Sequence, residues 1–133
     1  MATKGIIREL SEIKAVDGQV GHEAVHLHRL LKPDKAGPFY MSLTLDAMPP
    51  GAVVEPHYHT DCEVFDHAFY VASGKIAVRV GDEERVVGPD TVIWCPSNMT
   101  HSLKNVGKTK ARVLRIGASG KGDFTCKTVY PGN

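Results

Sequence analysis

The chain has 133 residues, of which 42% are hydrophobic and 23% charged, and its formal net charge is +1 at pH 7. This length and composition fit one compact soluble domain with a real hydrophobic core. The Lys and Arg residues are scattered rather than gathered on one stripe, and the apolar runs are short. We therefore expect neither a nucleic-acid partner nor a membrane-spanning segment.

The N-terminus and the cysteines favour a cytoplasmic protein. The segment MATKGIIRELSEIKAV has no apolar stretch followed by a small-residue cleavage site, so no secretory signal is apparent. The three cysteines, Cys62, Cys95 and Cys126, are too few and too dispersed for a disulfide framework. Reduced thiols and a cytoplasmic location are the resulting expectation.

The predicted secondary-structure elements are short. Residues 7–16 favour at most one short helix, which ends before Asp17 and Gly18. The later segments alternate between apolar and polar side chains like half-buried strands, and they cover residues 23–31, 39–48, 75–80, 85–96 and 111–118. In residues 75–80, Ile76, Val78 and Val80 share one face. The Gly-rich residues 117–133 are expected to be irregular apart from a short strand near residues 124–130.

Turn-forming sequences separate these strands. They are MPPGA (48–52), VGDEERV (80–86), GPDT (88–91) and NVGKT (105–109). Several short strands at such spacing are typical of an all-β sandwich or barrel. No internal repeat or linker divides the sequence, so one domain is expected over residues 1–133.

Three histidines are spaced so that they can share a metal ion. His57 and His59 are two residues apart, so on a strand both point to one face with Cα atoms roughly 7 Å apart. Imidazoles at that separation can converge on one ion with bonds of about 2 Å. His101 lies far along the chain, just after another turn, and a barrel can bring such a distant ligand to the same place.

At these residues the chain resembles the cupins, a family of small β-barrels of the jelly-roll type. The first cupin motif reads G-x5-H-x-H-x(3,4)-E-x6-G, and His57 and His59 match its histidine pair. Counting forward from His59 places Glu63 at the glutamate of the motif. Counting back from Gly74 reaches His67 instead, so the motif leaves two candidates for the third ligand.

The strand that follows favours His67. The run HAFYVASG (67–74) matches the usual family run E-x-F-Y-V-x-x-G, with His67 in place of the glutamate. Alternation puts His67, Phe69 and Val71 on one face, which is expected to be the barrel interior. We therefore favour His67 over Glu63 as a ligand, and residues 60–66 would form a small insertion at the barrel mouth. Glu63 stays a candidate for proton transfer.

The second cupin motif reads G-x5-P-x-G-x2-H-x3-N. Asp90 and Asn98 stand where the family has glycine, whereas Pro96, His101 and Asn105 keep their intervals. Because Asn and Asp are the non-glycine residues that best tolerate a positive φ, we expect both turns to survive. The resemblance spans about residues 39–117. It is specific for the fold and unspecific for function, since the family hosts many chemistries.

The resemblance implies a double-stranded β-helix, the cupin barrel, over about residues 39–117. N-terminal strands would occupy residues 1–38, and residues 118–133 would form a C-terminal extension. The implied metal ligands are His57, His59, His67 and His101, with Glu63 as the alternative to His67. Nitrogen-rich ligation favours Fe, Ni, Cu, Zn, Co or Mn and does not choose among them.

All-histidine centres of this kind resemble those of cupin dioxygenases. They imply a metal-dependent oxidoreductase of the dioxygenase type that acts on a small organic substrate. Two alternatives stay open: a non-redox isomerase, decarboxylase or lyase, and a non-catalytic cupin that binds a small ligand. Similarity to other small cupins also implies a homodimer that pairs through the strand expected at residues 23–31. Substrate and reaction are not determined by the sequence.

The remaining histidines receive no role in this interpretation. His26 and His28 form a second H-x-H, but no partner stands at motif spacing, so both are expected at the surface. His22 follows no pattern. A phosphosugar enzyme would need a cluster of Lys and Arg in its pocket, and the sequence does not place one.

Overall fold

The computed structural model describes residues 5–32, 40–60, 65–120 and 126–132. In this part of the chain, ten strands and one turn of 3-10 helix make up the regular structure. The helical turn η1 covers Leu10–Glu12, and the strands are β1 (His26–Leu31), β2 (Met41–Met48), β3 (Val53–Thr60), β4 (Phe65–Ser73), β5 (Ile76–Val80), β6 (Glu83–Val87), β7 (Thr91–Cys95), β8 (His101–Asn105), β9 (Ala111–Ser119) and β10 (Lys127–Val129).

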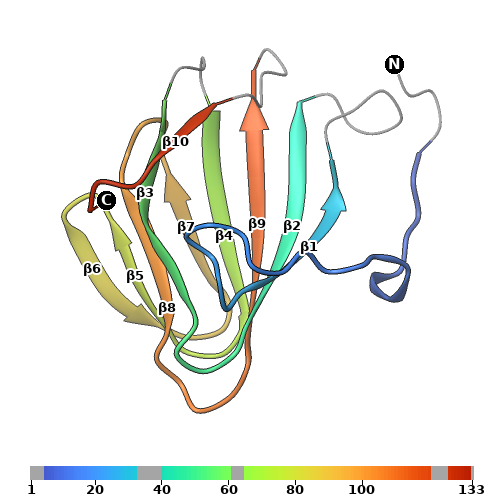
Figure 1. The fold of residues 1–133 in the computed structure, drawn as a ribbon, viewed down its shortest axis with the longest axis horizontal. Coiled ribbons are helices and arrows are strands. Elements are labelled where there is room, and N and C mark those ends of the chain that lie inside the picture. Colours follow the sequence, from blue (N-terminus) through green and yellow to red (C-terminus); the bar gives the residue numbers. More distant parts are fainter. Residues whose placement is uncertain (1–4, 33–39, 61–64, 121–125, 133) are drawn as a thin grey trace.

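The strands form two five-stranded sheets that face each other (Figure 1). The strand order is β1-β2-β9-β4-β7 in one sheet and β10-β3-β8-β5-β6 in the other. The neighbouring strands are antiparallel, and many come from distant parts of the sequence, as β2 and β9 do. The expected all-β fold, a double-stranded β-helix, is confirmed.

The N-terminal segment contains less helix than its sequence allows. A capping box joins Glu9 and Glu12, but the chain returns to an extended conformation at Ile13. No residue of η1 is buried, and without an apolar face to pack, such a short helix has nothing to extend it. The segment then bridges the sheets. Val16 pairs with Leu27 of β1, and the Glu55 amide of β3 donates to the Gly21 carbonyl.

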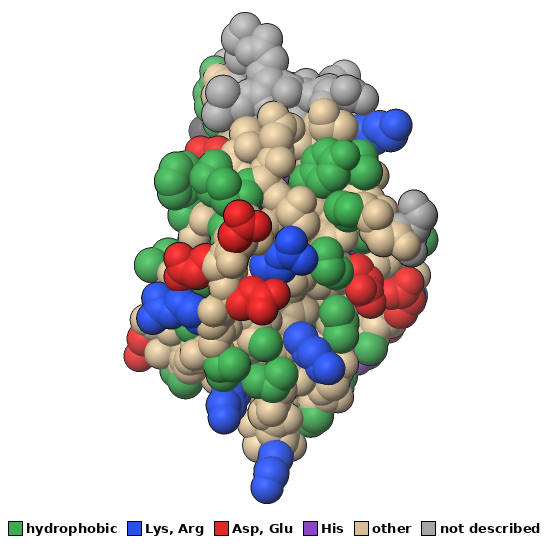
Figure 2. Space-filling model, turned by 90° about the vertical axis from the view of Figure 1, so that its left-hand side faces the viewer, with side chains coloured by type: hydrophobic (Ala, Val, Ile, Leu, Met, Phe, Trp, Pro, Cys, Tyr) green, Lys and Arg blue, Asp and Glu red, His purple; other side chains and the backbone are tan. Residues whose placement is uncertain are grey.

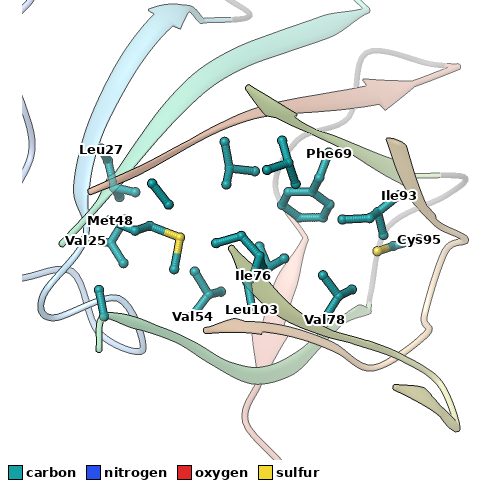
Figure 3. Close-up of a cluster of buried hydrophobic side chains, with 14 residues drawn as sticks. Val25, Leu27, Met48, Val54, Phe69, Ile76, Val78, Ile93, Cys95 and Leu103 are labelled. Carbon is teal, nitrogen blue, oxygen red and sulfur yellow. The ribbon is translucent and has the colours of Figure 1, made fainter. Parts of the chain in front are cut away.

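Alternate side chains of the strands fill the barrel. Figure 3 shows Leu27, Met48, Phe69, Ile76 and Leu103 in one apolar cluster that receives side chains from both sheets. Burying each such side chain contributes roughly 1.5–3 kcal/mol, so this cluster is the main stabilising element of the barrel.

Two turns adopt the conformation that the family glycines would provide. Asp90 has φ 63° and Asn98 has φ 66°, and they are the non-glycine residues with positive φ in the described part of the chain. The expectation that both turns survive the loss of glycine is therefore confirmed. Gly74, in contrast, cannot be replaced in the same way. Its φ is 100°, and a Cβ added there would lie 2.5 Å from the Ala111 Cβ.

The surface in Figure 2 carries acidic and basic side chains interspersed with apolar ones, with no concentrated basic face in this view. Among the described residues, no helix is both long and apolar enough for a membrane span. The expectation of three reduced thiols is wrong for Cys126, which is disulfide-bonded, whereas Cys95 is free and buried. Sequence spacing does not reveal which cysteines a barrel brings within bonding distance.

Candidate metal centre

A β-bulge in β3 turns the first histidine into the barrel. The register between β3 and β8 shifts between Val54 and His57, so both side chains are buried although they are three residues apart. Pro56 lies within this bulge, a position where a sheet tolerates proline, which has no N–H to donate. Beyond the bulge, His57 pairs directly with His101 of β8.

Three imidazoles converge where β3 and β8 pair within one sheet. One ring nitrogen each of His57, His59 and His101 lies within 4.8 Å of the other two. The ring centroids of His57 and His101 are 4.3 Å apart, and those of His57 and His59 are 5.0 Å apart. Because nitrogen ligands about 2 Å from one ion lie about 3–4 Å apart, small rotations of these rings suffice to hold a metal.

His67 reaches the same place from the opposite sheet. It lies on β4 between Gly117 of β9 and Cys95 of β7, and its side chain is buried. Its ring centroid is 4.7 Å from that of His59 and 5.6 Å from that of His101. Glu63 and the insertion expected at residues 60–66 lie partly or wholly outside the described residues, so the choice between His67 and Glu63 stays a prediction.

Backbone carbonyls fix the orientation of two of the rings. His57 Nδ1 donates to the Glu55 carbonyl at 2.7 Å, and His101 Nδ1 donates to the Met99 carbonyl at 3.0 Å. Since a carbonyl oxygen only accepts, Nδ1 must carry the proton, and in a neutral ring Nε2 then holds the lone pair. A hydrogen bond from the non-ligating ring N–H to a backbone carbonyl is typical of metal-ligating histidines. His101 Nε2 is buried without a hydrogen-bond partner, as expected of an atom reserved for a ligand.

Burial keeps these imidazoles neutral. It lowers the pKa of His57 to about 3 and that of His59 to about 4, with a further decrease from His101 in both cases. Burial likewise lowers the pKa values of His67 and His101. Only neutral imidazoles can donate to a metal, and they leave the charge of the ion uncompensated. In donor type, tautomer and protonation, the residues therefore fit a divalent transition metal.

His22 joins this site although no sequence pattern singled it out. Its side chain is 2% exposed, and its ring centroid lies 5.7 Å from that of His57. Nδ1 contacts the Val20 carbonyl at 3.2 Å, while Nε2 is buried without a hydrogen-bond partner. The contact of the N-terminal segment with β3 brings His22 here, and local sequence carries no sign of that contact.

A pocket of about 220 Å³ opens beside the histidines, lined in part by His59 and His67. Its other lining residues include Arg29, Lys32 and Arg115. The sequence did not place these cations, although Arg115 falls on the apolar face of its strand and could have been noticed there. A larger hollow, of about 390 Å³, is lined by residues of β5, β6 and β7 and contains none of the histidines.

Other residues singled out in the sequence have structural places. His26 contacts Asp17 at 2.6 Å with a side chain that is 43% exposed, which agrees with a surface position. The Asn105 side chain is buried and clamps a turn, donating to the Met48 and Thr109 carbonyls and accepting from the Gly107 amide.

Comparison with known proteins identifies the family. The model of the cupin domain matches residues 44–117, which is more than half of the chain. A polyketide synthase, CurC, from Streptomyces cyaneus is 32% identical over 88 residues, covering 66% of this chain and 55% of the relative. The chain thus spans little more than half the length of that relative.

Two solved structures share the architecture. The polyketide cyclase RemF from Streptomyces resistomycificus has a TM-score of 0.71 and 22% identity, and the match covers 86% of this chain and 80% of that one. A sugar phosphate isomerase of the cupin superfamily from Silicibacter pomeroyi has a TM-score of 0.76 and 19% identity over 94% and 81%. These likenesses concern the fold. Together with the family match and the convergent histidines, they make the conclusion plain: the chain belongs to the cupin family.

Proposed function

We propose that this cupin is a metal-dependent enzyme that activates small compounds with two carbonyl groups in a 1,3 relationship and closes them into a ring. The observation that carries the proposal is the approach of three neutral imidazoles, those of buried His57 and His101 and half-buried His59, whose ring nitrogens lie within 4.8 Å of one another. His67 is proposed as the fourth ligand.

The chain's own residues give such a site its chemical character. A divalent ion held there would act as a Lewis acid toward two carbonyl oxygens and make the C–H bonds next to these carbonyl groups more acidic. Four neutral ligands preserve the full charge of the ion, whereas a carboxylate ligand would reduce it. Four protein ligands on an octahedral ion also leave two positions for a bidentate substrate.

The reaction class is suggested by the relatives. CurC is described as a polyketide synthase and RemF as a polyketide cyclase, and polyketides are chains of 1,3-related carbonyl groups. Ring closure joins an acidified carbon to a carbonyl carbon further along the same molecule, with loss of one water. It requires no oxidant, so zinc suffices as the metal.

A dioxygenase is the second candidate. It is favoured by the nitrogen-only donor set among the described ligands, which accepts Fe, Ni and Cu as readily as Zn. Such an enzyme would use the same carbonyl compounds, consume dioxygen and cleave a C–C bond. The two candidates therefore differ in metal, oxygen demand and product rather than in the residues of the site.

One experiment separates them. Purified protein is analysed for metals, reconstituted with Zn²⁺ or Fe²⁺, and incubated with heptane-2,4,6-trione with and without oxygen. A cyclase forms 5-methylresorcinol, which is the trione minus one water, in either atmosphere. A dioxygenase takes up one O₂ per trione, cleaves one C–C bond and releases a carboxylic acid together with a 1,2-dicarbonyl compound. If neither product exceeds that formed by the His101→Ala variant, the proposed enzymatic function is wrong.

Assembly and location extend the proposal. β1 is the outer strand of its sheet, so a second copy could pair along it in a homodimer. The isolated bridge from Val16 to Leu27 occupies part of that edge. Light scattering of the purified protein tests the dimer, and a monomer at micromolar concentration would contradict it. A cytoplasmic location stays a prediction.

A further inference from the structure

A row of polar side chains crosses the inner face of one sheet, next to the histidines. Arg29 of β1 and Arg115 of β9 both pair with Thr44 of β2, on either side of it. Residues paired directly in antiparallel strands point to the same face of the sheet. Arg115 also pairs with Phe69 of the apolar core, so this face is the inner one.

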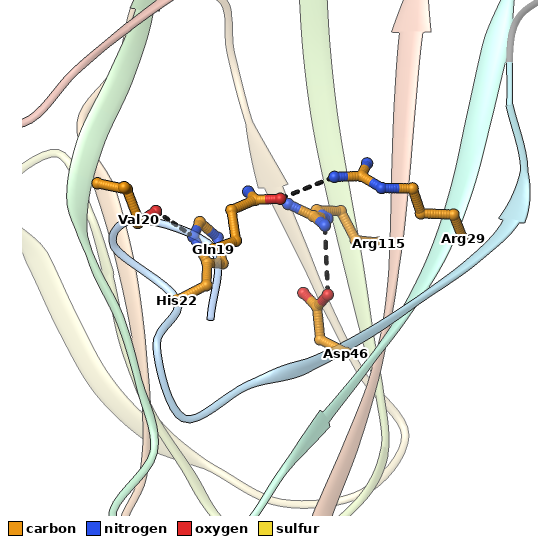
Figure 4. Close-up of polar contacts among 6 residues, drawn as sticks. All are labelled: Gln19, Val20, His22, Arg29, Asp46 and Arg115. Atoms are coloured by element: carbon orange, nitrogen blue, oxygen red, sulfur yellow. Dashed lines mark hydrogen bonds and ion pairs between the residues drawn. The ribbon is translucent and has the colours of Figure 1, made fainter. Parts of the chain in front are cut away.

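Each guanidinium group contacts one polar side chain that orients it. Arg115 Nη2 lies 3.3 Å from Asp46 Oδ1, and Arg29 Nη2 donates to Gln19 Oε1 at 2.7 Å. Figure 4 shows the Arg29 guanidinium directed at Gln19, which the N-terminal segment supplies, and the Arg115 guanidinium directed at Asp46. These contacts orient the two cations without neutralising Arg29, because the oxygen of Gln19 bears no charge.

The charges of this cluster do not balance. Two guanidinium groups face one carboxylate, that of Asp46, which leaves one positive charge among these residues. The side chains of Arg115 and Asp46 are only 15% and 1% exposed, so water screens the imbalance poorly. Burial lowers the pKa of Arg29 most, and the charge of Arg115 lowers it further.

The same cations share a pocket with the proposed metal ligands. Arg29, Lys32 and Arg115 line the pocket of about 220 Å³, whose wall also includes His59 and His67. Pockets for drug-sized ligands occupy roughly 300–1,000 Å³, so this one fits a molecule of a few carbon atoms. A molecule inside can therefore contact guanidinium groups and histidines at the same time.

We propose that this pocket is a carboxylate-binding subsite and that the substrate of the proposed enzyme is a keto acid whose carboxylate lies beyond its two 1,3-related keto groups. The carboxylate would lie between Arg29 and Arg115, and the keto groups would face the histidines. Acetoacetate is a short mimic of such an acid. The two guanidinium groups and Asp46 leave one unbalanced positive charge, while the exposed Lys32 ammonium is screened by water. This charge matches a single carboxylate better than a phosphate monoester, which carries about two charges at neutral pH. Planar guanidinium groups also suit the two oxygens of a carboxylate. The assignment of the keto groups to the histidines rests on the proposed function, whereas the assignment of the carboxylate to the arginines does not.

The carboxylate end is tested by NMR titration of the chelator-treated protein with acetoacetate, with the neutral amide acetoacetamide and with inorganic phosphate. We expect acetoacetate to bind more tightly than the other two. Arg29→Gln should weaken acetoacetate binding by about 10- to 100-fold, the usual effect of losing a hydrogen bond to a charged group. Arg112→Gln is the matched control, because Arg112 lies on β9 with its side chain exposed. The acetoacetate affinity of this variant should stay unchanged.

A second variant protects the test against misfolding. Removing Arg115 alone would leave Asp46 buried and charged, so Arg115→Gln is combined with Asp46→Asn, and this pair should also lose the preference for acetoacetate over acetoacetamide. Equal binding of acid and amide, tighter binding of phosphate, or an unchanged affinity in Arg29→Gln would each overturn the proposal. Titration of Zn²⁺-loaded protein tests the keto end separately. If zinc leaves acetoacetate affinity unchanged while the arginine variants still lose it, the proposed metal function fails and the carboxylate subsite stands.

Discussion

His57 and His101 face each other directly across the β3–β8 ladder, with ring centroids 4.3 Å apart. Each ring is anchored by Nδ1 to a backbone carbonyl two residues before it in the sequence, Glu55 for one and Met99 for the other. This shared arrangement aligns both rings before any metal arrives, so little conformational entropy remains to be lost on binding.

Loss of either anchored ring should abolish metal binding. We expect His57→Ala and His101→Ala to fall from about one ion per chain to near zero after dialysis, because each variant loses a donor that a backbone carbonyl orients and keeps only three of the four proposed imidazoles. Elemental analysis measures the content. His26→Ala serves as the control, since His26 is exposed and contacts Asp17 instead. Full metal content in His101→Ala would contradict the site.

The fourth ligand is decided by a matched pair of variants. We expect His67→Gln to weaken zinc affinity by at least about tenfold, because it removes a nitrogen ligand of the ion. Glu63→Gln should leave zinc affinity unchanged, because Glu63 is not expected to bind the ion. Competition with a chromophoric chelator measures both affinities. The opposite outcome, in which Glu63→Gln loses the ion and His67→Gln retains it, would place the glutamate in the centre.

The sequence predicts the barrel well because its determinants are local. Strand alternation, turn residues and the tolerance of Asp90 and Asn98 for positive φ are properties of short segments. His22 and the Arg29–Arg115 pair escaped prediction for the opposite reason. They meet the site only through the register of three strands and the path of the N-terminal segment. Alternation places Arg115 on the apolar face of its strand, but it does not show that this face meets Arg29 and the histidines.

The metal-free protein should lose stability in mild acid. The pKa values of His57 and His59 fall from 6.5 to about 3 and about 4 in the folded protein. Between pH 6.5 and 4 the unfolded chain therefore binds protons that the folded chain excludes, and the free energy of unfolding decreases as the pH falls. Each histidine contributes up to about 1.4 kcal/mol per pH unit, and this loss is absent above pH 7.

Urea denaturation of chelator-treated protein at pH 7.5, 6 and 5 measures this slope. His57→Gln should reduce the slope of unfolding free energy against pH, because a glutamine takes up no proton in either state. His26→Gln, at an exposed position, should leave the slope as it is. An identical slope in the wild type and His57→Gln would show that burial of this imidazole does not govern the acid response.

Asn98 should be replaceable by glycine but not by alanine. Its φ of 66° lies in the left-handed region, which costs an ordinary residue roughly 1–2 kcal/mol and glycine almost nothing. We expect Asn98→Ala to lower the free energy of unfolding by about 1 kcal/mol and Asn98→Gly to leave it within about 0.5 kcal/mol of the wild type. Urea denaturation of the metal-loaded protein measures both. Because the turn at Asn98 leads into His101, the alanine variant should also bind zinc more weakly, and equal stability of the two variants would refute the conformational explanation.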